Sequence, residues 1–471
     1  MVSLSELLVG SPAPRQVSAK QVRDARPGAR QLVVLDDDPT GTQSVAELPV
    51  LNSWGAEDLE WALATGAAAV YVMTNSRSLS PADAEARNRE VVASALTAAG
   101  RLGVEVDFVS RSDSTLRGHY PLEPDVIMDA LREAGARVDA VVIVPAFGDA
   151  GRITIDSIHY AGSAAAGFVP VGETEFARDA TFGYASSDLR EWVEEKTAGR
   201  ISAGEVASIT LRDLRLDPVA VVAKLASLEG GRPVVVDAVE ESDLRCLALA
   251  LLEAEASGRR FVYRVGPPFV RALIGQDVLE PLGGEDVANI SHGSGTGGGL
   301  VVVGSHVGLT TRQLDRLRER RSPTEFEIDV HTILGEGADA HLTGLVDDVC
   351  RALGDGNVVL RTTRRLVTGA DGDDSLRIAR AVSDAVVRVV RAVLDRTPPR
   401  FVIAKGGITS SDVAARGLEI GRAIVRGPML PGIVSLWEPI AGPARGIPYI
   451  VFAGNVGDDD SLADVADKLS A

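Results

Sequence analysis

The chain has few cysteines and no long apolar segment. Cys246 and Cys350 are the only two cysteines among 471 residues, and they lie far apart and outside any CxxC spacing. A disulfide framework and a zinc site are therefore not indicated, and a reducing cytoplasm fits best. No apolar run reaches the ~18 residues that a membrane span needs, and the N-terminus lacks the basic start and long apolar stretch of a signal peptide. We expect a cytoplasmic protein that is neither exported nor bound to a membrane.

Positive net charge and the common nucleotide motifs are also lacking. The formal net charge of -18 would repel a polyanion at long range, so we expect no nucleic-acid partner. Neither GxGxxG nor GxxxxGK[ST] stands at a strand end, which disfavours a standard dinucleotide fold and a P-loop. The histidines never form HExxH. Aromatic residues are scarce, at 4%, but hydrophobic residues reach 45%, which excludes disordered and fibrous classes.

Short β-branched runs alternate with longer helical patterns along both halves of the chain. The runs are LVVL (32–35), AVYVM (69–73), VEVDFV (104–109), DAVVIV (139–144), LVVV (300–303), NVVL (357–360), RFVIA (400–404) and PYIVF (448–452). Strands that alternate with helices predict parallel βαβ units. We therefore expect an α/β protein of two domains, each a mostly parallel sheet flanked by helices, with the active site in the cleft between them.

A glycine-rich stretch separates the two halves. We expect a polar tail at 1–29, a first domain at 30–285, an interdomain linker at 286–299 and a second domain at 300–471. The alternative for NISHGSGTGGG (289–299) is a phosphate loop. No Lys-Ser or Lys-Thr pair follows its last glycine, which favours the linker.

Polar residues follow the strands of the first half. The loops DDDPTGTQ (36–43), TNSRS (74–78), SRSDSTLRGH (110–119) and PAFGDAGR (145–152) supply carboxylates, hydroxyls, an amide and arginines. In open α/β sheets, ligands bind beyond the carboxyl ends of the strands. These loops predict a site for a small, highly oxygenated anion, because carboxylates accept from hydroxyls and arginines clamp a carboxylate bidentately. The alternative is that each loop is a turn whose acid caps the following helix.

Small residues follow the strands of the second half. The loops GSHVGLTTRQ (304–313), KGGITSSD (405–412) and AGNVGDDDS (453–461) each join a strand to a helix. Unpaired amides and the helix dipole at a helix N-terminus favour an anion, so these loops predict a phosphate site to which Lys405 adds a point charge. The alternative for KGGITSSD is a plain αL turn capped by Ser411 or Asp412.

The ordered set of motifs resembles the four-carbon acid sugar kinases, a family that includes 3-oxo-tetronate, D-threonate and D-erythronate kinases. PAFGDAGRITIDSIHYAG, VGETEFARDATFGYASSDL and GPMLPGIVSLW add to the likeness, which runs from about residue 31 to the C-terminus. It implies an N-terminal sugar-acid-binding domain and a C-terminal nucleotide-binding domain that uses ATP to phosphorylate a hydroxyl of a small sugar acid. Many members read closer to DDLTGA where this chain has DDDPTGTQ, so the exact acid stays open. The resemblance implies ATP contacts by Ser305, Gly406, Gly407, Ile408, Thr409 and Gly454.

For the acid itself, the hypothesis places the carboxylate against Arg117, with Arg77 or Arg152 assisting. Its hydroxyls would contact Asp36, Asp37, Asn75 and Ser114. Asp37 first, and Asp113 second, would accept the proton during phosphoryl transfer. Mg²⁺ would accompany ATP, and no residue is assigned to the metal. Two rival functions stay open, an NAD-dependent oxidoreductase or epimerase of a sugar acid and a non-catalytic sugar-acid sensor. A homodimer is one option for the oligomeric state.

Overall fold

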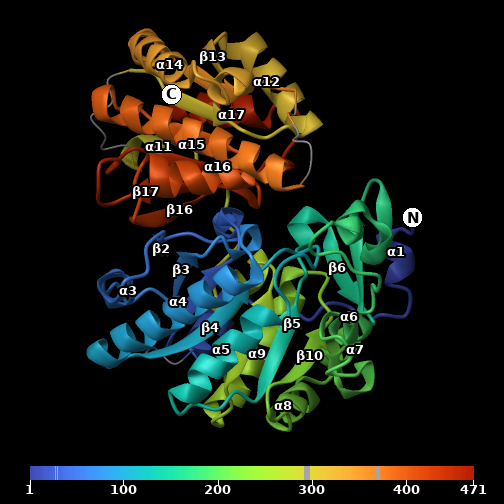
Figure 1. Ribbon diagram of the computed structural model, residues 1–471. Helices are drawn as coiled ribbons and strands as arrows, with labels where there is room; N and C mark the ends of the chain where they lie inside the picture. The colour runs from blue at the N-terminus through green and yellow to red at the C-terminus, as the bar shows by residue number, and fades with distance from the viewer. Residues whose placement is uncertain (27, 29, 291–296, 366, 368–371, 471) are drawn as a thin grey trace. The chain divides into compact units, whose positions relative to one another are not determined.

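The chain folds into two compact units, each described here by itself. The computed structural model describes residues 1–26, 28, 30–290, 297–365, 367 and 372–470. Unit 1 contains Met1–Pro49 and Ser53–Val278, and unit 2 contains Val50–Asn52 and Leu279–Ala471 (Figure 1). Both units are α/β structures built around a largely parallel sheet, which confirms the predicted fold class.

The large sheet of unit 1 is entirely parallel. Its strands follow the order β3 (Ala69–Met73), β1 (Arg30–Asp36), β4 (Glu105–Arg111), β11 (Phe261–Val265), β5 (Ala140–Val144), β10 (Arg232–Val236) and β9 (Ala207–Ile209). The register pairs Asp36 with Met73 on one side and with Arg111 on the other. The loops after β1, β3 and β4 therefore start at the same edge of the sheet.

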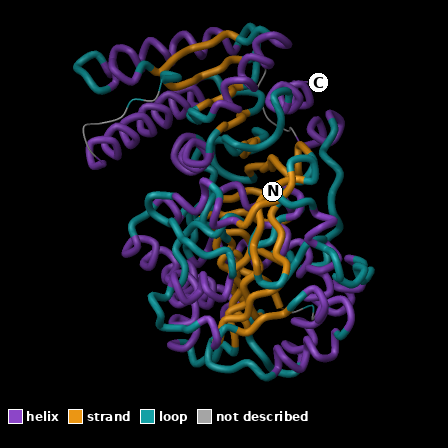
Figure 2. Tube along the Cα trace, turned by 90° about the vertical axis from the view of Figure 1, so that its right-hand side faces the viewer, coloured by secondary structure: helices purple, strands orange, loops and turns teal. Residues whose placement is uncertain are grey.

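Two groups of helices cover the faces of this sheet, as Figure 2 shows. One group is α3 (Ala56–Ala64), α4 (Pro81–Leu102) and α5 (Leu122–Glu133); the other is α2 (Ala19–Ala25), α7 (Leu211–Leu216), α8 (Pro218–Ala226), α9 (Glu241–Ala256) and α10 (Pro267–Leu273). Helices α1 (Leu4–Leu7) and α6 (Leu189–Lys196) complete the unit, with an antiparallel sheet of β6 (Arg152–Ile155), β7 (Ile158–Ser163) and β8 (Gly167–Pro170). Because helices cover both faces, most side chains of these strands are buried and apolar, and charged residues such as Arg111 and Arg264 form buried ion pairs.

The sheet of unit 2 is parallel on one side and antiparallel on the other. Strands β13 (Thr324–Ile328), β14 (Val358–Thr362), β12 (Leu300–Val303), β15 (Val402–Lys405) and β18 (Tyr449–Phe452) are parallel, and β17 (Ile433–Pro439) and β16 (Arg422–Leu430) follow as an antiparallel pair. Lys405 pairs with Val303 and with Phe452. The loops after β12, β15 and β18 thus begin at one edge.

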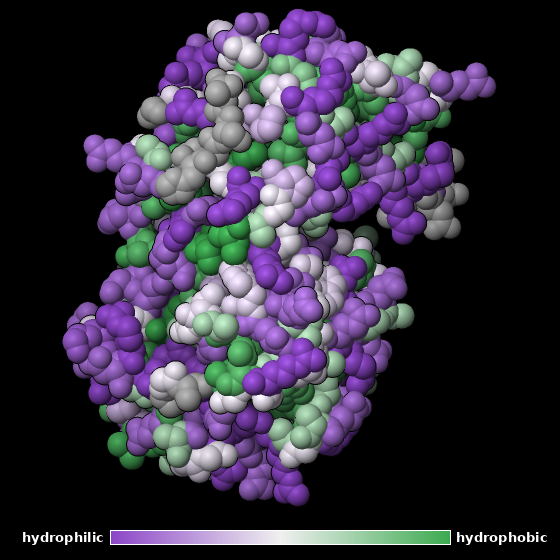
Figure 3. Space-filling model, turned by 90° about the vertical axis from the view of Figure 1, so that its left-hand side faces the viewer, coloured by the Kyte–Doolittle hydropathy of each residue, from purple (hydrophilic) through white to green (hydrophobic). Residues whose placement is uncertain are grey.

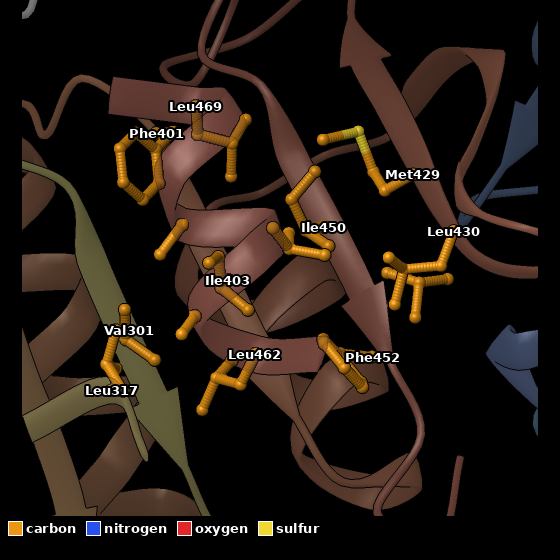
Figure 4. Packing of buried hydrophobic residues seen from close by; sticks show 14 of the residues in the cluster. Val301, Leu317, Phe401, Ile403, Met429, Leu430, Ile450, Phe452, Leu462 and Leu469 are labelled. Atoms are coloured by element: carbon orange, nitrogen blue, oxygen red, sulfur yellow. The ribbon is translucent and has the colours of Figure 1, made fainter. Parts of the chain in front are cut away.

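Seven helices of unit 2 lie within the described residues. They are α11 (Gly284–Ile290), α12 (Gly308–Arg321), α13 (Val330–Ile333), α14 (Ala338–Leu353), α15 (Gly372–Arg396), α16 (Gly407–Asp412) and α17 (Ser461–Ser470). Figure 4 shows the core that α12 and α17 form with the sheet, where Leu462 and Leu469 lie beside Ile403 and Ile450. Hydrophilic residues cover much of the face in Figure 3, as expected when the strands hold the apolar side chains. In the described parts of the chain, no helix is long and apolar enough to span a bilayer.

The segment expected as a linker contributes to unit 2. Val287 of α11 is 4% exposed and belongs to the unit 2 core, and Leu282 N–H bonds to Pro428 O at 2.8 Å. Past residues 291–296, which lie outside the described residues, Gly298 N–H bonds to Leu353 O at 2.6 Å. The described parts of 286–299 are therefore packed against unit 2. The high glycine content pointed to a linker, but Val287 and Ile290 of α11 pack on the core.

Three residues from the first half of the chain belong to unit 2. Val50–Asn52, at the end of β2 (Leu48–Leu51), are assigned to it. Asn52 donates from its backbone N to Gly421 O at 3.0 Å and from Nδ2 to Ile420 O at 2.8 Å. Sequence reasoning did not anticipate this exchange, because an apolar run does not say which sheet it joins.

Candidate active site

The first carboxylate after β1 is part of the fold. Asp36 is 0% exposed and forms an ion pair with Arg111 at the end of β4. Gly41 covers the pair so closely that a Cβ there would be 2.1 Å from Asp36 Oδ2 and 2.2 Å from Arg111 Nε. Asp36 thus neutralises a buried arginine, and its contact with a substrate hydroxyl stays a prediction.

The third carboxylate caps the following turn. Asp38 accepts from Thr40 N at 2.9 Å at the start of the 3₁₀ turn Pro39–Ser44. The capping alternative considered for this loop thus applies to Asp38. Asp37, which is bonded by Arg77, stays a candidate for substrate chemistry.

A single guanidinium group joins the loops after β1, β3 and β4. Arg77 donates to Asp37 from Nη2 at 2.8 Å and from Nε at 3.2 Å. Its Nη2 lies 3.5 Å from Asp38 Oδ2, and its Nη1 lies 3.9 Å from Asp113 Oδ2. The structure therefore brings Asp37, Arg77 and Asp113 together, as the shared sheet edge predicts. Arg77 is already engaged with carboxylates.

The two candidate bases have opposite electrostatics. Burial raises the pKa of Asp37 to about 7, although the bidentate Arg77 opposes this rise. Burial acts in the same direction on Asp113, but Arg77, Arg117 and a hydrogen bond from Thr115 outweigh it and hold the pKa of Asp113 well below its usual range. Asp113 is therefore ionised throughout the neutral range, whereas Asp37 changes protonation within it.

Two arginines share one aromatic ring beside these carboxylates. The guanidinium carbons of Arg117 and Arg152 lie 5.3 and 5.7 Å from the centroid of Phe176. Arg117 donates to Asp113 at 2.6 Å and lies 3.8 Å from Asp179. Arg152 donates to the carbonyl of its own loop, and no carboxylate of the described residues lies within ion-pair distance of it. Sequence reasoning missed Phe176, although it lies within VGETEFARDATFGYASSDL.

A buried network of hydrogen bonds around Glu123 lies next to this edge of the sheet. Glu123 of α5 accepts from Arg264 of β11 at 2.9 Å, from Ser110 at 3.1 Å and from Ser76 at 2.5 Å. Sequence reasoning missed both charged residues. Their signal is a lone arginine inside the apolar run FVYRV and a glutamate in the first turn of a helix.

The two remaining expected residues lie on the same edge. Asn75 has a left-handed backbone, with φ of 48°, and its N–H bonds to Asp36 O at 3.2 Å. Ser114 is buried, and its carbonyl bonds to His159 Nε2 at 2.7 Å. Both are close in sequence and space to the carboxylate cluster.

The three glycine loops of unit 2 converge on one small cradle. A Cβ on Gly454 would be 2.4 Å from Ser305 Oγ, and a Cβ on Gly304 would be 2.1 Å from Thr409 Oγ1. A Cβ on Gly406 would meet both Thr409 Oγ1, at 3.1 Å, and Ser305 Cβ, at 3.4 Å. Glycine is thus required at these three positions because the loops approach each other closely. The first N–H groups of α16 lie beside them. The structure brings these predicted residues together.

Lys405 does not take part in the cradle with its side chain. It is 0% exposed, and its ammonium donates to Ala453 O at 2.7 Å over the ring of Phe452. Burial lowers the pKa of Lys405 to about 7. The side chain of Lys405 thus turns into the unit, and a phosphate charge supplied by its ammonium stays a prediction. Its carbonyl instead accepts from Gly304 N and Ser305 N.

An apolar pocket of about 380 Å³ adjoins the cradle within unit 2. Gly304, Ile408 and Thr409 connect it to the glycine loops. Its apolar walls include Val330, Ile378, Val382 and Val386. Sequence reasoning missed these residues, although the four-residue spacing of the last three places them on one face of α15.

Comparisons with known proteins agree with this layout. Residues 32–273 match the family described as Sugar-binding N-terminal domain, and residues 300–462 match Nucleotide-binding C-terminal domain. A D-erythronate kinase of Heliobacterium modesticaldum is 26% identical over 418 residues, which are 85% of this chain and 87% of the relative. A D-threonate kinase of Salmonella typhimurium is 29% identical over 259 residues, 54% of this chain and 53% of the relative.

Solved structures share the fold. A Salmonella typhimurium LT2 protein described as a tRNA synthase is 19% identical, with a TM-score of 0.68 over 92% of this chain and 98% of that one. A Haemophilus influenzae protein of the family DUF1537 is 20% identical, with a TM-score of 0.61 over 92% and 99%. The domain matches and the named relatives define a two-domain sugar-acid kinase. The chain belongs to the four-carbon acid sugar kinase family.

Proposed function

We propose that the chain transfers the γ-phosphoryl group of ATP to a hydroxyl of a four-carbon sugar acid such as threonate, erythronate or 3-oxo-tetronate. The observation that carries the proposal is the geometry of one sheet edge, where Arg77 holds the carboxylates of Asp37 and Asp113 together. Burial also raises the pKa of Asp37 to about 7. A base works best when its pKa lies near the operating pH. The names of the relatives, D-erythronate kinase and D-threonate kinase, support the four-carbon acids.

Arg152 is the cation best placed to receive the carboxylate of the acid. Arg117 is neutralised by Asp113 and Asp179, whereas Arg152 has no such partner in the described chain. Phe176 supports the Arg152 guanidinium from one side. Asn75 and Ser114 would contact the hydroxyls, and Asp37 would accept the proton as the new O–P bond forms.

Unit 2 supplies the nucleotide site in this proposal. The phosphates would lie on the N–H groups of Gly407, Ile408 and Thr409 at the start of α16, and against Ser305 and Gly454. The adenine ring would occupy the adjoining apolar pocket, whose size suits it. Transfer requires donor phosphorus and acceptor hydroxyl in line, so the two bound substrates have to meet during turnover.

Mg²⁺ would enter with the nucleotide. Among the described residues, no three His, Cys, Asp or Glu side chains are grouped to hold a metal ion, and Asp36, Asp37 and Asp113 are paired with arginines. This arrangement fits an ion carried mainly by phosphate oxygens, which is the usual mode for Mg²⁺ in kinases. When bound, the ion would neutralise charge on the transferring phosphate.

An ADP-release assay across a panel of sugar acids tests the proposal. We expect turnover with at least one four-carbon acid and none with the matching neutral polyol, because Arg152 has no carboxylate to bind there. The panel contains tetronates, pentonates and their oxo forms. Absence of ADP release with every acid, or turnover that depends on NAD, would reject it.

Gly454→Ala is expected to weaken nucleotide binding by roughly 10-fold. The added Cβ would be 2.4 Å from Ser305 Oγ, so the cradle has to open, and the backbone of Gly454 is not left-handed, so space rather than strain is the cause. The KM for ATP measures the effect. Gly344→Ala is the control, since its Cβ in α14 meets no atom within 4 Å. An equal change in the KM for the sugar acid would contradict the assignment.

Val382→Phe is expected to raise the KM for ATP by roughly 10-fold and to leave the KM for the acid unchanged. The larger ring would fill the space assigned to adenine. Val387→Phe, on the same helix but outside the pocket lining, serves as the control. A KM for ATP that stays at the wild-type value would place the adenine elsewhere.

A further inference from the structure

Arg364 lies beside the glycine cradle, in the loop that follows β14. Its Nη1 donates to the carbonyl of Ser305, and its Nη2 donates to Thr311 Oγ1 at 2.9 Å. Ser305 stands at the end of β12, and Thr311 lies in the first turn of α12. One guanidinium group thus bridges the loop and the helix that form one wall of the cradle.

Among the described residues, no carboxylate balances the charge of Arg364. No carboxylate of the described residues lies within ion-pair distance of it, whereas its neighbours are paired. Arg361 pairs with Glu325 and Glu327, and Arg312 pairs with Asp459 at 2.8 Å. A half-buried cation without a counter-charge is costly and calls for an anion.

The surroundings of Arg364 make the imbalance larger. Burial lowers its pKa, and the charges that add to this effect are those of Arg361 and Arg318. Its Nε is buried and has no hydrogen-bond partner among the described residues. Two of its five N–H groups are used by the contacts above, so donors are left over.

We propose that Arg364 is the cation that binds the nucleotide phosphates, in the role that sequence reasoning gave to Lys405. The Lys405 ammonium is turned away to Ala453 O, whereas the Arg364 guanidinium contacts the cradle loop itself. Its hydrogen bond to the Ser305 carbonyl also fixes the loop against which the phosphates would bind. The inference depends on the proposed kinase function and names the charge that this site uses.

Direct binding of adenosine, ADP and ATP to the full chain, measured by titration calorimetry, tests the inference. Arg364→Gln is expected to weaken ADP and ATP by roughly 10- to 100-fold, the range for charge-assisted hydrogen bonds, and to leave adenosine unchanged. Adenosine lacks the phosphates but uses the same base pocket. Equal weakening of all three ligands would mean a general loss of structure and would overturn the inference, as would unchanged ADP binding.

Two further variants keep the test decisive. Arg312→Gln removes an equal charge from the same region but from an exposed ion pair, so it should bind ADP as the wild type does. If Arg364→Gln does not fold, Arg364→Lys decides, with a selective loss of ADP expected and an equal loss of adenosine as the contrary result. Wild-type protein that binds no ADP would refute the kinase proposal itself, which separates the two failures.

Discussion

Asp37→Asn is expected to lower kcat by about 10²- to 10⁴-fold, the usual contribution of a general base, while the chain still folds. The amide keeps the shape of the carboxyl group and can still accept one bond from Arg77, but it cannot take a proton. ADP release measures kcat, and thermal melting reports the fold. An unchanged kcat would refute the assignment of Asp37 as the base.

Asp237→Asn is the matched control. Burial raises the pKa of Asp237 to about 7 as well, but its carboxylate accepts from the backbone N–H groups of Asp156, Ser157 and Leu211. Its loss should therefore lower the melting temperature and leave kcat close to wild type. A large fall in kcat for this variant would mean that any buried carboxyl at this edge matters, and Asp37 would lose its special role.

The pH profile follows from the same group. The base has to be ionised, and the protonated fraction of Asp37 grows as the pH falls through about 7. Wild-type kcat should thus fall on the acid side of neutrality, with an apparent pKa near that value. A kcat that stays flat from neutral pH down to the ordinary range of aspartate would contradict the raised pKa.

Arg152→Gln is expected to raise the KM for the sugar acid by roughly 100-fold with a smaller effect on kcat. Arg152 is the cation of this edge without a carboxylate at ion-pair distance in the described chain, and Phe176 holds its guanidinium from one side. Steady-state KM values with saturating ATP measure the change. Arg152→Lys should recover part of the affinity, because lysine restores the charge but not the planar fork.

Arg117→Gln provides the comparison. Arg117 is bound to Asp113, so its removal should act mainly by releasing that carboxylate. A KM that rises strongly for Arg117→Gln and not at all for Arg152→Gln would return the carboxylate site to Arg117, the residue that the sequence favoured.

The elements that carry the two sites could be predicted because parallel strands end at a common edge. The runs LVVL (32–35), VEVDFV (104–109) and RFVIA (400–404) overlap the strands β1, β4 and β15. Within unit 1 the loops after β1 and β4 start at one edge, and within unit 2 the loop after β15 shares an edge with those after β12 and β18. Local signals also set helix starts. Ser80 and Pro81 are typical of a helix start, and α4 does begin at Pro81 with Ser80 as its cap; it ends at Leu102, before Gly103 with φ of 67°.

Choices between similar side chains could not be predicted from the sequence. Nothing in SRSDSTLRGH or PAFGDAGR says that Arg117 finds a carboxylate partner and Arg152 does not, because the partners come from folded loops. KGGITSSD likewise does not reveal that Lys405 turns inward. The loop after β14 gave no motif for Arg364, whose environment is set by Ser305 and Thr311 from another part of the chain.

The most direct test of phosphoryl transfer between the two sites is ³¹P NMR of a reaction that contains the protein, Mg²⁺, ATP and the preferred four-carbon acid. The account predicts that a phosphate monoester of the acid appears in step with ADP, in equal amounts. Loss of ATP to ADP and inorganic phosphate without any ester, or no change with any acid of the panel, would contradict it.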